Sequence, residues 1–151
     1  MAVIASLDQL TKALVLANFE PHVAYPVIGD WARLYLLFNS GAAFSIGEGH
    51  TWIFTLIQLG FVAGALWYSP KVRTAWVAAG CAMVAGGALG NLIDRLLRAP
   101  GFFVGHVVDF ISVGSFAVFN LADSAITCGV VVLLIGLIKE EKMMGKEEQR
   151  A

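Results

Sequence analysis

The stretch Gly49–Pro70, GHTWIFTLIQLGFVAGALWYSP, contains 22 consecutive residues without a charged side chain. A second run, of 20 uncharged residues, lies between Arg73 and Asp94. Each run is long enough for one helix across a hydrocarbon core of ~30 Å. The two runs therefore predict two neighbouring membrane spans, at residues 50–69 and 74–96.

The composition of the whole chain agrees with a membrane protein. Hydrophobic residues make up 58% of the 151 residues and charged residues 14%, against roughly 25% charged in a typical soluble domain. Eight of the 21 charges lie in Lys139–Ala151, so the first 138 residues have too few to cover a soluble surface. A net charge of -1 also excludes nucleic-acid binding. We predict a single integral-membrane domain, residues 1–151.

Two further helices are predicted, one near each end of the chain. Met1–Phe19 is short, but it ends cleanly before a Glu-Pro pair. Phe110–Ile138 contains one charge, Asp123, and a weak point at Ser112–Ser115, so its helix should begin after Gly114. The four predicted spans are residues 1–19, 50–69, 74–96 and 115–138, followed by a tail at residues 139–151.

The lysine and arginine residues near the span ends predict the orientation. The link at residues 69–73 and the tail hold six, whereas the opposite side holds three. The link, the tail and the N-terminus are therefore predicted to be cytoplasmic. On the outer side, Trp31–Phe38 has the alternation of a strand lying at the membrane surface. The predicted fold is membrane all-α, with four transmembrane helices and a small extracytoplasmic β-structure between the first and second helices.

The polar residues inside the predicted spans converge on one level. Asp123 lies about 24 Å, and Asn91 about 27 Å, from the predicted cytoplasmic ends of their helices, at 1.5 Å per residue. Gly87, Asn91 and Arg95 follow at i, i+4 and i+8, on one helix face. Ionisable groups inside a span are costly and suggest function. This level, near the outer edge of the hydrocarbon core, is the predicted functional site.

Asp109 and Asp123 are the candidate catalytic pair. A continuous helix would separate them by about 21 Å, but a turn at Gly114 can fold Asp109 back over the helix start. Two carboxylates in a low-dielectric site cannot both ionise comfortably, so one pKa rises and the pair shares a proton. The charged aspartate can activate water while the protonated one polarises a scissile carbonyl, which suits peptide hydrolysis. Asn120 could orient Asp123 or the substrate backbone.

Each of these residues also has a structural interpretation. Asp123 could form a buried ion pair with Arg95, and Asp109 could be a helix cap or an exposed interface residue. Asn91 is as suited to hydrogen bonding between helices as to substrate binding. These alternatives stay open at the level of single residues.

Two other polar features bear on the class of site. Asp8 and Lys12 stand at i, i+4 in the favourable acid-first order, which favours a structural ion pair. His106 lies three residues from Asp109, but further ligands are lacking nearby, so we predict no metal site.

Five blocks of the sequence form an ordered pattern: Asp8–Lys12, Asn39–Ser45, Gly86–Arg95, Gly105–Phe110 and Phe119–Ser124. In this order they resemble the blocks of the lipoprotein signal peptidase (signal peptidase II) family, over nearly the whole chain. The resemblance implies a four-span aspartyl peptidase of the bacterial cytoplasmic membrane, with an extracytoplasmic β-cradle and an active site near that face. It implies cleavage of prolipoproteins just before a cysteine that carries diacylglycerol.

The resemblance also implies roles for single residues. Asp109 and Asp123 match the catalytic pair. The expected partners are diacylated prolipoproteins, membrane phospholipids and inhibitors like the cyclic peptide globomycin, with no metal or cofactor and a monomeric chain. The other matched positions are the pocket residues Asn39, Gly87, Asn91, Arg95 and Asn120, and the supporting polar pair Asp8 and Lys12.

The first span departs from the family pattern. If Asp8 lies at the outer depth, about 16 helical residues should precede it, and seven do. The span is short by about two turns and the family's cytoplasmic N-terminal stretch is absent. We therefore expect that translation starts upstream or that the N-terminus has been trimmed.

Two other classes of function compete with the peptidase. A proton-coupled carrier would use its membrane carboxylates as a relay, although the chain has no internal repeat. A serine–lysine protease would use Lys12 as the base for a nearby hydroxyl. Its serine would be Ser6, Ser40, Ser45 or Ser124.

Overall fold

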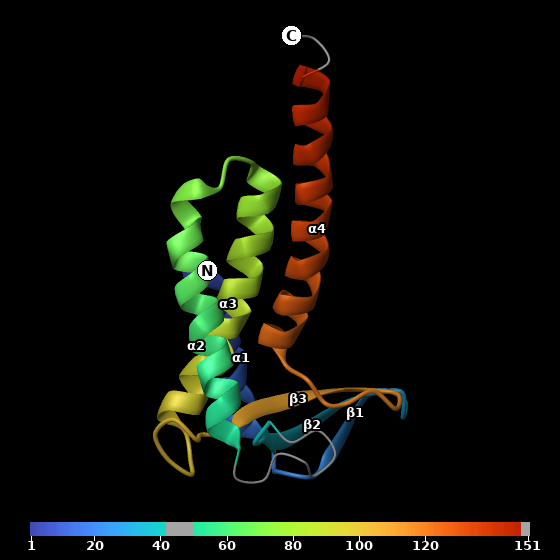
Figure 1. Ribbon diagram of the computed structural model, residues 1–151. Helices are drawn as coiled ribbons and strands as arrows, with labels where there is room; N and C mark the ends of the chain where they lie inside the picture. The colour runs from blue at the N-terminus through green and yellow to red at the C-terminus, as the bar shows by residue number, and fades with distance from the viewer. Residues whose placement is uncertain (42–49, 149–151) are drawn as a thin grey trace.

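The protein is described from a computed structural model, which covers residues 1–41 and 50–148. Within these ranges, four helices stand on a small antiparallel sheet of three strands (Figure 1). The helices are α1 (Ala2–Asn18), α2 (Thr51–Tyr68), α3 (Ala75–Leu97) and α4 (Leu121–Glu148), with a 3-10 turn η1 (Ser69–Lys71). The strands are β1 (Ala24–Ile28), β2 (Ala32–Asn39) and β3 (Val107–Val113).

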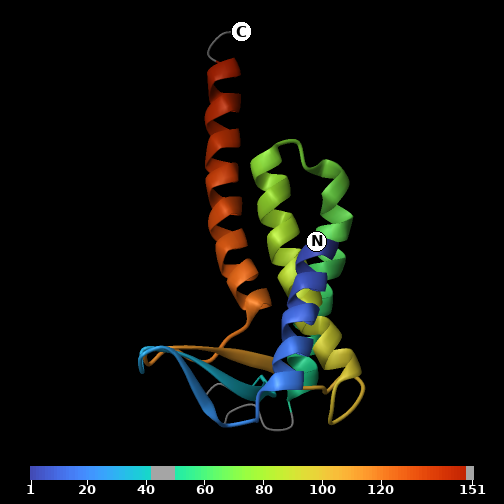
Figure 2. The ribbon, with the colours of Figure 1, turned by 180° about the vertical axis from the view of Figure 1, so that it is seen from behind.

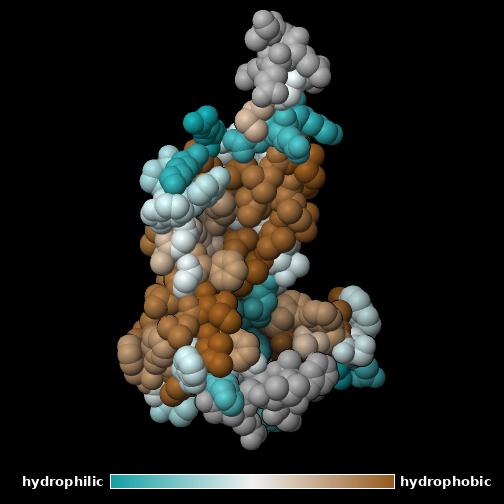
Figure 3. Space-filling view, in the orientation of Figure 1, coloured by the Kyte–Doolittle hydropathy of each residue, from teal (hydrophilic) through white to brown (hydrophobic). Residues whose placement is uncertain are grey.

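Three helical segments are long and apolar enough to cross a membrane. They are Thr51–Lys71, Ala75–Leu97 and Leu121–Gly145. Apolar side chains cover the middle of these helices, and hydrophilic residues gather at the end away from the sheet (Figure 3). On these helices, large apolar side chains such as Phe61, Trp67 and Leu134 are more than half exposed. This is the surface expected of a protein surrounded by lipid.

The fourth helix, α1, has 17 residues and starts part-way along the bundle (Figures 1 and 2). It packs on α3, because Gly86 and Gly90 leave room for it. A Cβ at Gly86 would lie 2.8 Å from Cβ of Ile4, and one at Gly90 would lie 2.5 Å from Oδ2 of Asp8. The close approach brings the polar side chains of α1 into contact with α3.

The sheet contains the strand predicted at Trp31–Phe38, which is β2, the central strand. The expectation that the β-structure lies between the first and second helices is only partly right, because β3 comes from the segment between α3 and α4. Its sequence, VVDFISV, is rich in β-branched and aromatic residues, which favour an extended chain. β3 pairs with β2 from Asn39↔Val107 to Ala32↔Val113.

The last helix begins later than the sequence predicted. Gly114 adopts a φ of +54° and donates its N–H to the carbonyl oxygen of Trp31 at 2.7 Å, which ends β3. The chain then returns along β3, where the N–H of Phe119 donates to the carbonyl oxygen of Ile111 at 3.0 Å. The helix expected after Gly114 therefore begins at Leu121, and it continues through the predicted tail to Glu148.

Candidate active site

Buried polar side chains gather where the sheet meets the ends of α1, α3 and α4. Charged residues are rarely buried unless they are paired, so this cluster is informative. At most 4% of the surface of any of them is exposed. We call them the polar layer: Asp8, Lys12, Asn91, Asp94, Arg95, Asp109 and Asn120.

Asp109 lies in β3, opposite Leu37 of β2, and is 1% exposed. Its Oδ2 accepts a hydrogen bond from Nδ2 of Asn39 at 2.8 Å. Its Oδ1 accepts one from Nδ2 of Asn120 at 2.7 Å. The strand pairing therefore fixes the backbone of Asp109, while two amides fix its carboxyl group.

Asp123 lies in the first turn of α4. Its Oδ1 accepts a hydrogen bond from Nδ2 of Asn91 at 2.8 Å, and its Oδ2 accepts one from the N–H of Asn120 at 3.1 Å. In return, the N–H of Asp123 donates to Oδ1 of Asn120 at 2.9 Å. This reciprocal pair is a capping box, with aspartate in the place of the usual glutamate. The helix start therefore fixes the carboxylate.

Asn120 joins the two aspartates. Its Nδ2 donates to Asp109, while its backbone N–H and Oδ1 both contact Asp123. The same Nδ2 lies 3.1 Å from Oδ1 of Asn91. The turn at Gly114 thus places Asp109 and Asp123 on either side of one buried amide.

The environment of Asp109 changes its acidity. The pKa of Asp109 is raised from 3.8 to about 7, mainly by burial and also by the negative charge of Asp123. The hydrogen bonds from Asn39 and Asn120 oppose this rise. Asp109 can therefore hold a proton close to neutral pH, as the acid of an acid–base pair must.

Lys12 lies at the centre of the polar layer. Its Nζ lies 2.8 Å from each of Oδ2 of Asp8, Oδ2 of Asp94 and Oδ1 of Asn91. An ammonium group has three N–H donors, and these three acceptors use all of them. These contacts hold Nζ against α3 and Asp8 rather than against a serine hydroxyl, which disfavours the serine–lysine mechanism. Of its four proposed serine partners, Ser45 lies outside the described residues.

Arg95 contacts backbone rather than the aspartates. Its Nη1 donates to the carbonyl oxygens of Ser40 at 3.3 Å and Gly105 at 3.4 Å, and its guanidinium lies 5.6 Å from the ring centre of Phe54. Within residues 1–41 and 50–148, the ion pairs are Asp8–Lys12, Lys12–Asp94 and Asp94–Arg98. The alternative of an Arg95–Asp123 ion pair is therefore wrong. Arg95 instead ties α3 to the segments flanking the sheet.

Gly87 sets the spacing between α3 and α4. A Cβ at this position would overlap the backbone oxygen of Ala122 and lie 2.7 Å from Cγ1 of Ile126. Only a glycine lets the first turn of α4 come this close. The contact places Asp123 beside Asn91, one turn further along the same face of α3.

The chain is similar to known proteins over nearly its full length. Residues 1–139 match the family described as Signal peptidase (SPase) II. The chain belongs to the signal peptidase II family. It is 48% identical over 150 residues to a lipoprotein signal peptidase of Rhodococcus jostii (strain RHA1), covering 97% of this chain and 76% of the relative. A lipoprotein signal peptidase of Mycobacterium avium (strain 104) is 46% identical over 134 residues, covering 89% and 74%.

The fold of this signal peptidase II member is similar to that of a solved structure. That structure is of a bacterial membrane enzyme, obtained by the in meso method at 2.3 Å resolution. The TM-score is 0.79 at 30% sequence identity, and the match covers 92% of this chain and 85% of the other. Sequence and fold therefore agree on the family, as the five sequence blocks predicted.

The sequence analysis missed one buried residue of the polar layer in this peptidase, Asp94. Asp94 is 0% exposed and contacts Lys12, and it also accepts hydrogen bonds from Gln9 at 3.0 Å and Arg98 at 2.6 Å. A charged residue inside a predicted span is a signal that could have found Asp94. Gln9 and Arg98 are part-exposed and lie outside the polar layer, and they gave no comparable signal, because polar residues are common at helix ends.

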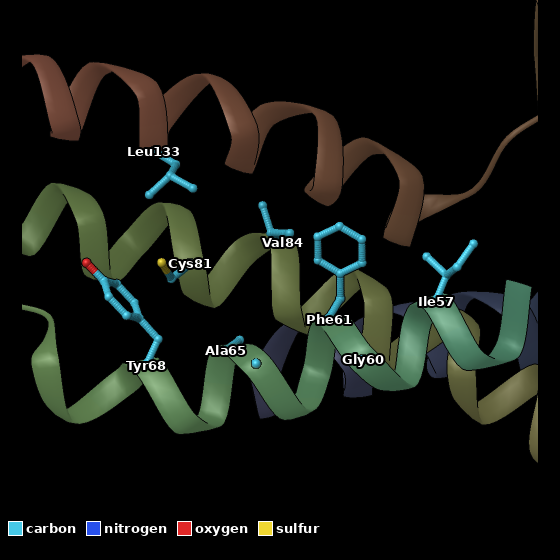
Figure 4. Close-up of a pocket in the computed structure, with 9 residues that line it drawn as sticks. Ile57, Gly60, Phe61, Ala65, Tyr68, Cys81, Val84 and Leu133 are labelled. Carbon is cyan, nitrogen blue, oxygen red and sulfur yellow. The ribbon is translucent and has the colours of Figure 1, made fainter.

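Two cavities lie against the helices of the peptidase. One, of about 450 Å³, opens beside Asp123 along α4 and is lined by Phe116, Phe119 and Thr127 among others. The other, of about 470 Å³, lies between α2, α3 and α4, where apolar side chains such as Phe61 and Leu133 point into it (Figure 4). Only the first reaches a member of the aspartate pair.

The part of the chain that the structure describes contains no group of three His, Cys, Asp or Glu side chains that could hold a metal ion. The candidate groups of the site are the two carboxyl groups and the amides that contact them.

Proposed function

We propose that Asp109 and Asp123 are the catalytic carboxylates of this signal peptidase II family member. The observation that carries the proposal is the position of Asn120: its side-chain amide donates to the carboxyl group of Asp109, and its backbone N–H donates to that of Asp123, so one residue holds both carboxyl groups at one site. Their environments differ, and a difference between two carboxyl groups is what separates an acid from a base.

The family is one of aspartic peptidases, and this chain removes signal peptides from prolipoproteins. Such hydrolysis needs a base to activate water and an acid to protonate the carbonyl oxygen. Asp109, whose pKa burial raises to about 7, is the acid. Asp123 is the base, because the first turn of α4 stabilises negative charge through the helix dipole.

The reaction then runs in two balanced steps. A water molecule loses a proton to Asp123 as its oxygen attacks the scissile carbonyl carbon, and Asp109 gives its proton to the carbonyl oxygen. In the second step the C–N bond breaks. Asp123 passes its proton to the leaving nitrogen, and Asp109 takes a proton back from a hydroxyl of the intermediate. Asn39, Asn91 and Asn120 keep the carboxyl groups in place throughout.

The arrangement in the membrane is also part of the proposal. We infer four spans, with α1 as the fourth, and an extracytoplasmic sheet. Basic residues support this orientation, because Lys71 and Lys139 lie at the end away from the sheet, each 3.8 Å from the ring centre of a tryptophan. Such pairs are typical of the membrane interface, and basic residues favour the cytoplasmic side. The membrane is then the bacterial cytoplasmic membrane.

The substrate we propose carries diacylglycerol on the cysteine that follows the scissile bond. Asp123 lies 16 residues, or about 24 Å, from Lys139 along α4, so it lies within ~6 Å of the edge of a ~30 Å hydrocarbon core. The glycerol of a lipidated cysteine lies at the same depth. Lipid burial at ~0.8 kcal/mol per methylene would then position the bond. We also propose that membrane phospholipids surround this site and that inhibitors of the globomycin type bind in it. The protein would act as a monomer.

Incubation with a prolipoprotein in its diacylated and unmodified forms tests this proposal. The purified peptidase in lipid vesicles should release the signal peptide from the diacylated form at a much higher rate. Mass spectrometry of the products locates the cut, which should fall on the N-terminal side of the lipidated cysteine. Equal rates for the two forms would contradict lipid-set depth, and no cleavage of either would contradict the proposed activity.

A further inference from the structure

We propose that Asp94 is a positioning residue that holds both catalytic aspartates in place through a single carboxylate oxygen. The inference rests on the proposed roles of Asp109 and Asp123. Asp94 lies near the end of α3 and is 0% exposed. Its hydrogen-bond partners are Lys12, Val108, Arg98 and Gln9 rather than either catalytic aspartate, so it acts through its neighbours.

All the acceptor positions of this carboxylate are occupied. Oδ2 accepts from Nζ of Lys12 at 2.8 Å and from the N–H of Val108 at 3.1 Å. Oδ1 accepts from Nε of Arg98 at 2.6 Å and from Nε2 of Gln9 at 3.0 Å. The four contacts reach α1, α3 and β3, which are elements far apart in the sequence.

The first connection runs through Val108 to Asp109. β3 is an edge strand of the sheet, so one side of its backbone has no neighbouring strand. Further along that edge, the N–H groups of Phe110 and Ile111 donate to the carbonyl oxygen of Phe119. At Val108 the partner is Oδ2 of Asp94. The side chain of Asp94 thus fixes β3 against α3 one residue before the catalytic Asp109.

The second connection runs through Lys12 and Asn91 to Asp123. Nζ of Lys12 donates to Oδ1 of Asn91 at 2.8 Å, so the oxygen of this amide faces α1. Its Nδ2 must then face the other way, where it donates to Asp123 at 2.8 Å. Rotating the amide by half a turn would place two donors against each other. Asp94, with Asp8, holds the lysine that sets this orientation.

Asparagine cannot accept hydrogen bonds at both of the positions that Oδ1 and Oδ2 of Asp94 occupy. If the amide oxygen took the place of Oδ2, its NH₂ group would face the donors of Gln9 and Arg98. In the opposite orientation the NH₂ group would face Lys12 and the N–H of Val108. Either way, a donor meets donors, and Lys12 keeps one carboxylate partner instead of two.

Asp94→Asn, compared with Arg98→Gln, tests the proposal. Arg98 is 26% exposed and contacts Oδ1 only, so Arg98→Gln weakens the same carboxylate while leaving Oδ2 intact. The readouts are kcat and KM for a diacylated prolipoprotein, both normalised to the folded fraction. We expect Asp94→Asn to lower kcat roughly 100-fold with KM within about threefold, because small misplacements of catalytic groups cost this much. We expect Arg98→Gln to keep kcat within about twofold, since the catalytic geometry is unchanged.

A second variant keeps the test decisive if Asp94→Asn fails to fold. Replacing the amide of Val108 by an ester, through incorporation of the α-hydroxy acid, removes one N–H and leaves every side chain in place. We expect this change to lower kcat roughly tenfold, again with little change in KM. A wild-type kcat in the ester variant, or in folded Asp94→Asn, would overturn the inference. An equal loss of kcat in Arg98→Gln would also overturn it, because the effect would then follow general stability.

The same assays separate this inference from the proposed function. If Asp109→Asn and Asp123→Asn are inactive while Asp94→Asn has wild-type kcat, only the positioning role is wrong. If either aspartate variant cleaves at a normal rate, the assignment of the catalytic pair is wrong.

Discussion

The two ends of the helical bundle are stabilised by different kinds of contact. At the sheet end, the polar layer is buried and closely bonded, so that Lys12 alone has three partners at 2.8 Å. Away from the sheet, α2, α3 and α4 line an open cavity of about 470 Å³ with apolar side chains (Figure 4). The sheet end depends on the geometry of its hydrogen bonds, because buried donors need acceptors. The far half depends instead on apolar packing and on close helix contacts such as that of Gly80 with Leu133.

Glycines show the same contrast. At Gly87 and Gly90 an added Cβ would collide with Ala122 and Asp8, so these positions fix how α4 and α1 meet α3. At Gly60 and Gly64 of α2, nothing lies within 4 Å of an added Cβ. Gly87 and Gly90 are therefore essential for the close approach of the helices, whereas Gly60 and Gly64 of α2 are replaceable.

The largest effect should come from the aspartates themselves. We expect Asp109→Asn and Asp123→Asn each to abolish detectable cleavage, a loss of at least about 10³-fold, because one shared proton serves both steps. Both variants should remain folded, since asparagine has the same shape. Signal-peptide release from a diacylated prolipoprotein measures the loss.

Asp30→Asn is a matched control for these two variants. It makes the same chemical change at an exposed carboxylate, in the turn between β1 and β2. Its cleavage rate should equal that of the wild type. Near-normal turnover by Asp109→Asn or Asp123→Asn would contradict the comparison, because the polar layer and the adjoining Asp123 would then be structural only.

The pH dependence of stability tests whether the burial of Asp109 is costly. The pKa of Asp109 is about 7 in the folded protein, against 3.8 for an ordinary aspartate. Between these two pH values the folded state holds a proton that the unfolded state has lost, so stability falls as pH rises through this window. The contribution is complete below 3.8 and is lost above about 7. The full difference corresponds to roughly 4 kcal/mol.

Thermal melts of the wild type and Asp109→Asn between pH 5 and pH 8 measure this effect. The wild type should lose several degrees of Tm more than the variant across this range, because asparagine does not titrate. Cleavage by the wild type should also fall as pH rises above about 7, when the acid loses its proton. The same dependence of Tm on pH in the two proteins would show that the burial of Asp109 does not destabilise the folded state.

Two helices and one turn of the fold could be predicted from the sequence. The uncharged runs at residues 49–70 and 74–93 form most of α2 and α3, and charged residues bound them on both sides. The turn at Gly114 that returns Asp109 toward Asp123 was also predictable, since glycine readily adopts the positive φ seen there. Local chain chemistry was sufficient in these cases.

Other features needed the folded structure. β3 borders the same apolar stretch as α4, so hydropathy alone did not identify it as a strand, although the helix was expected to begin only after Gly114. The start of α4 did carry a local signal, because Asn120 and Asp123 have the spacing of a capping box. The role of Asp94 had no such signal. Its partners Lys12 and Val108 are 82 and 14 residues away, and only tertiary packing brings them to one oxygen.

A smaller effect is expected from Gly87→Ala, which would sharpen the contrast between the two sets of glycines. The new methyl group would push the first turn of α4 away from α3. We expect a loss of about 1–3 kcal/mol in stability, typical of overpacking, together with a fall in kcat as Asp123 moves away from Asn91. Thermal melting and the cleavage assay measure the two effects. Unchanged values of both would show that the helix spacing is not critical.

The smallest effect should come from Gly60→Ala and Gly64→Ala, which make the same substitution on α2 beside the cavity. An added methyl meets nothing within 4 Å at either position, so it introduces no clash. Alanine also favours a helix over glycine by roughly 1 kcal/mol, which offsets any small loss. We therefore expect both variants to keep wild-type kcat and to melt at the wild-type temperature or slightly above it. The measurement is the one used for Gly87→Ala, in the same lipid. A loss of activity in either variant without a loss of Tm would mean that the far half is also shaped for a specific contact, and the distinction between the two ends would fail.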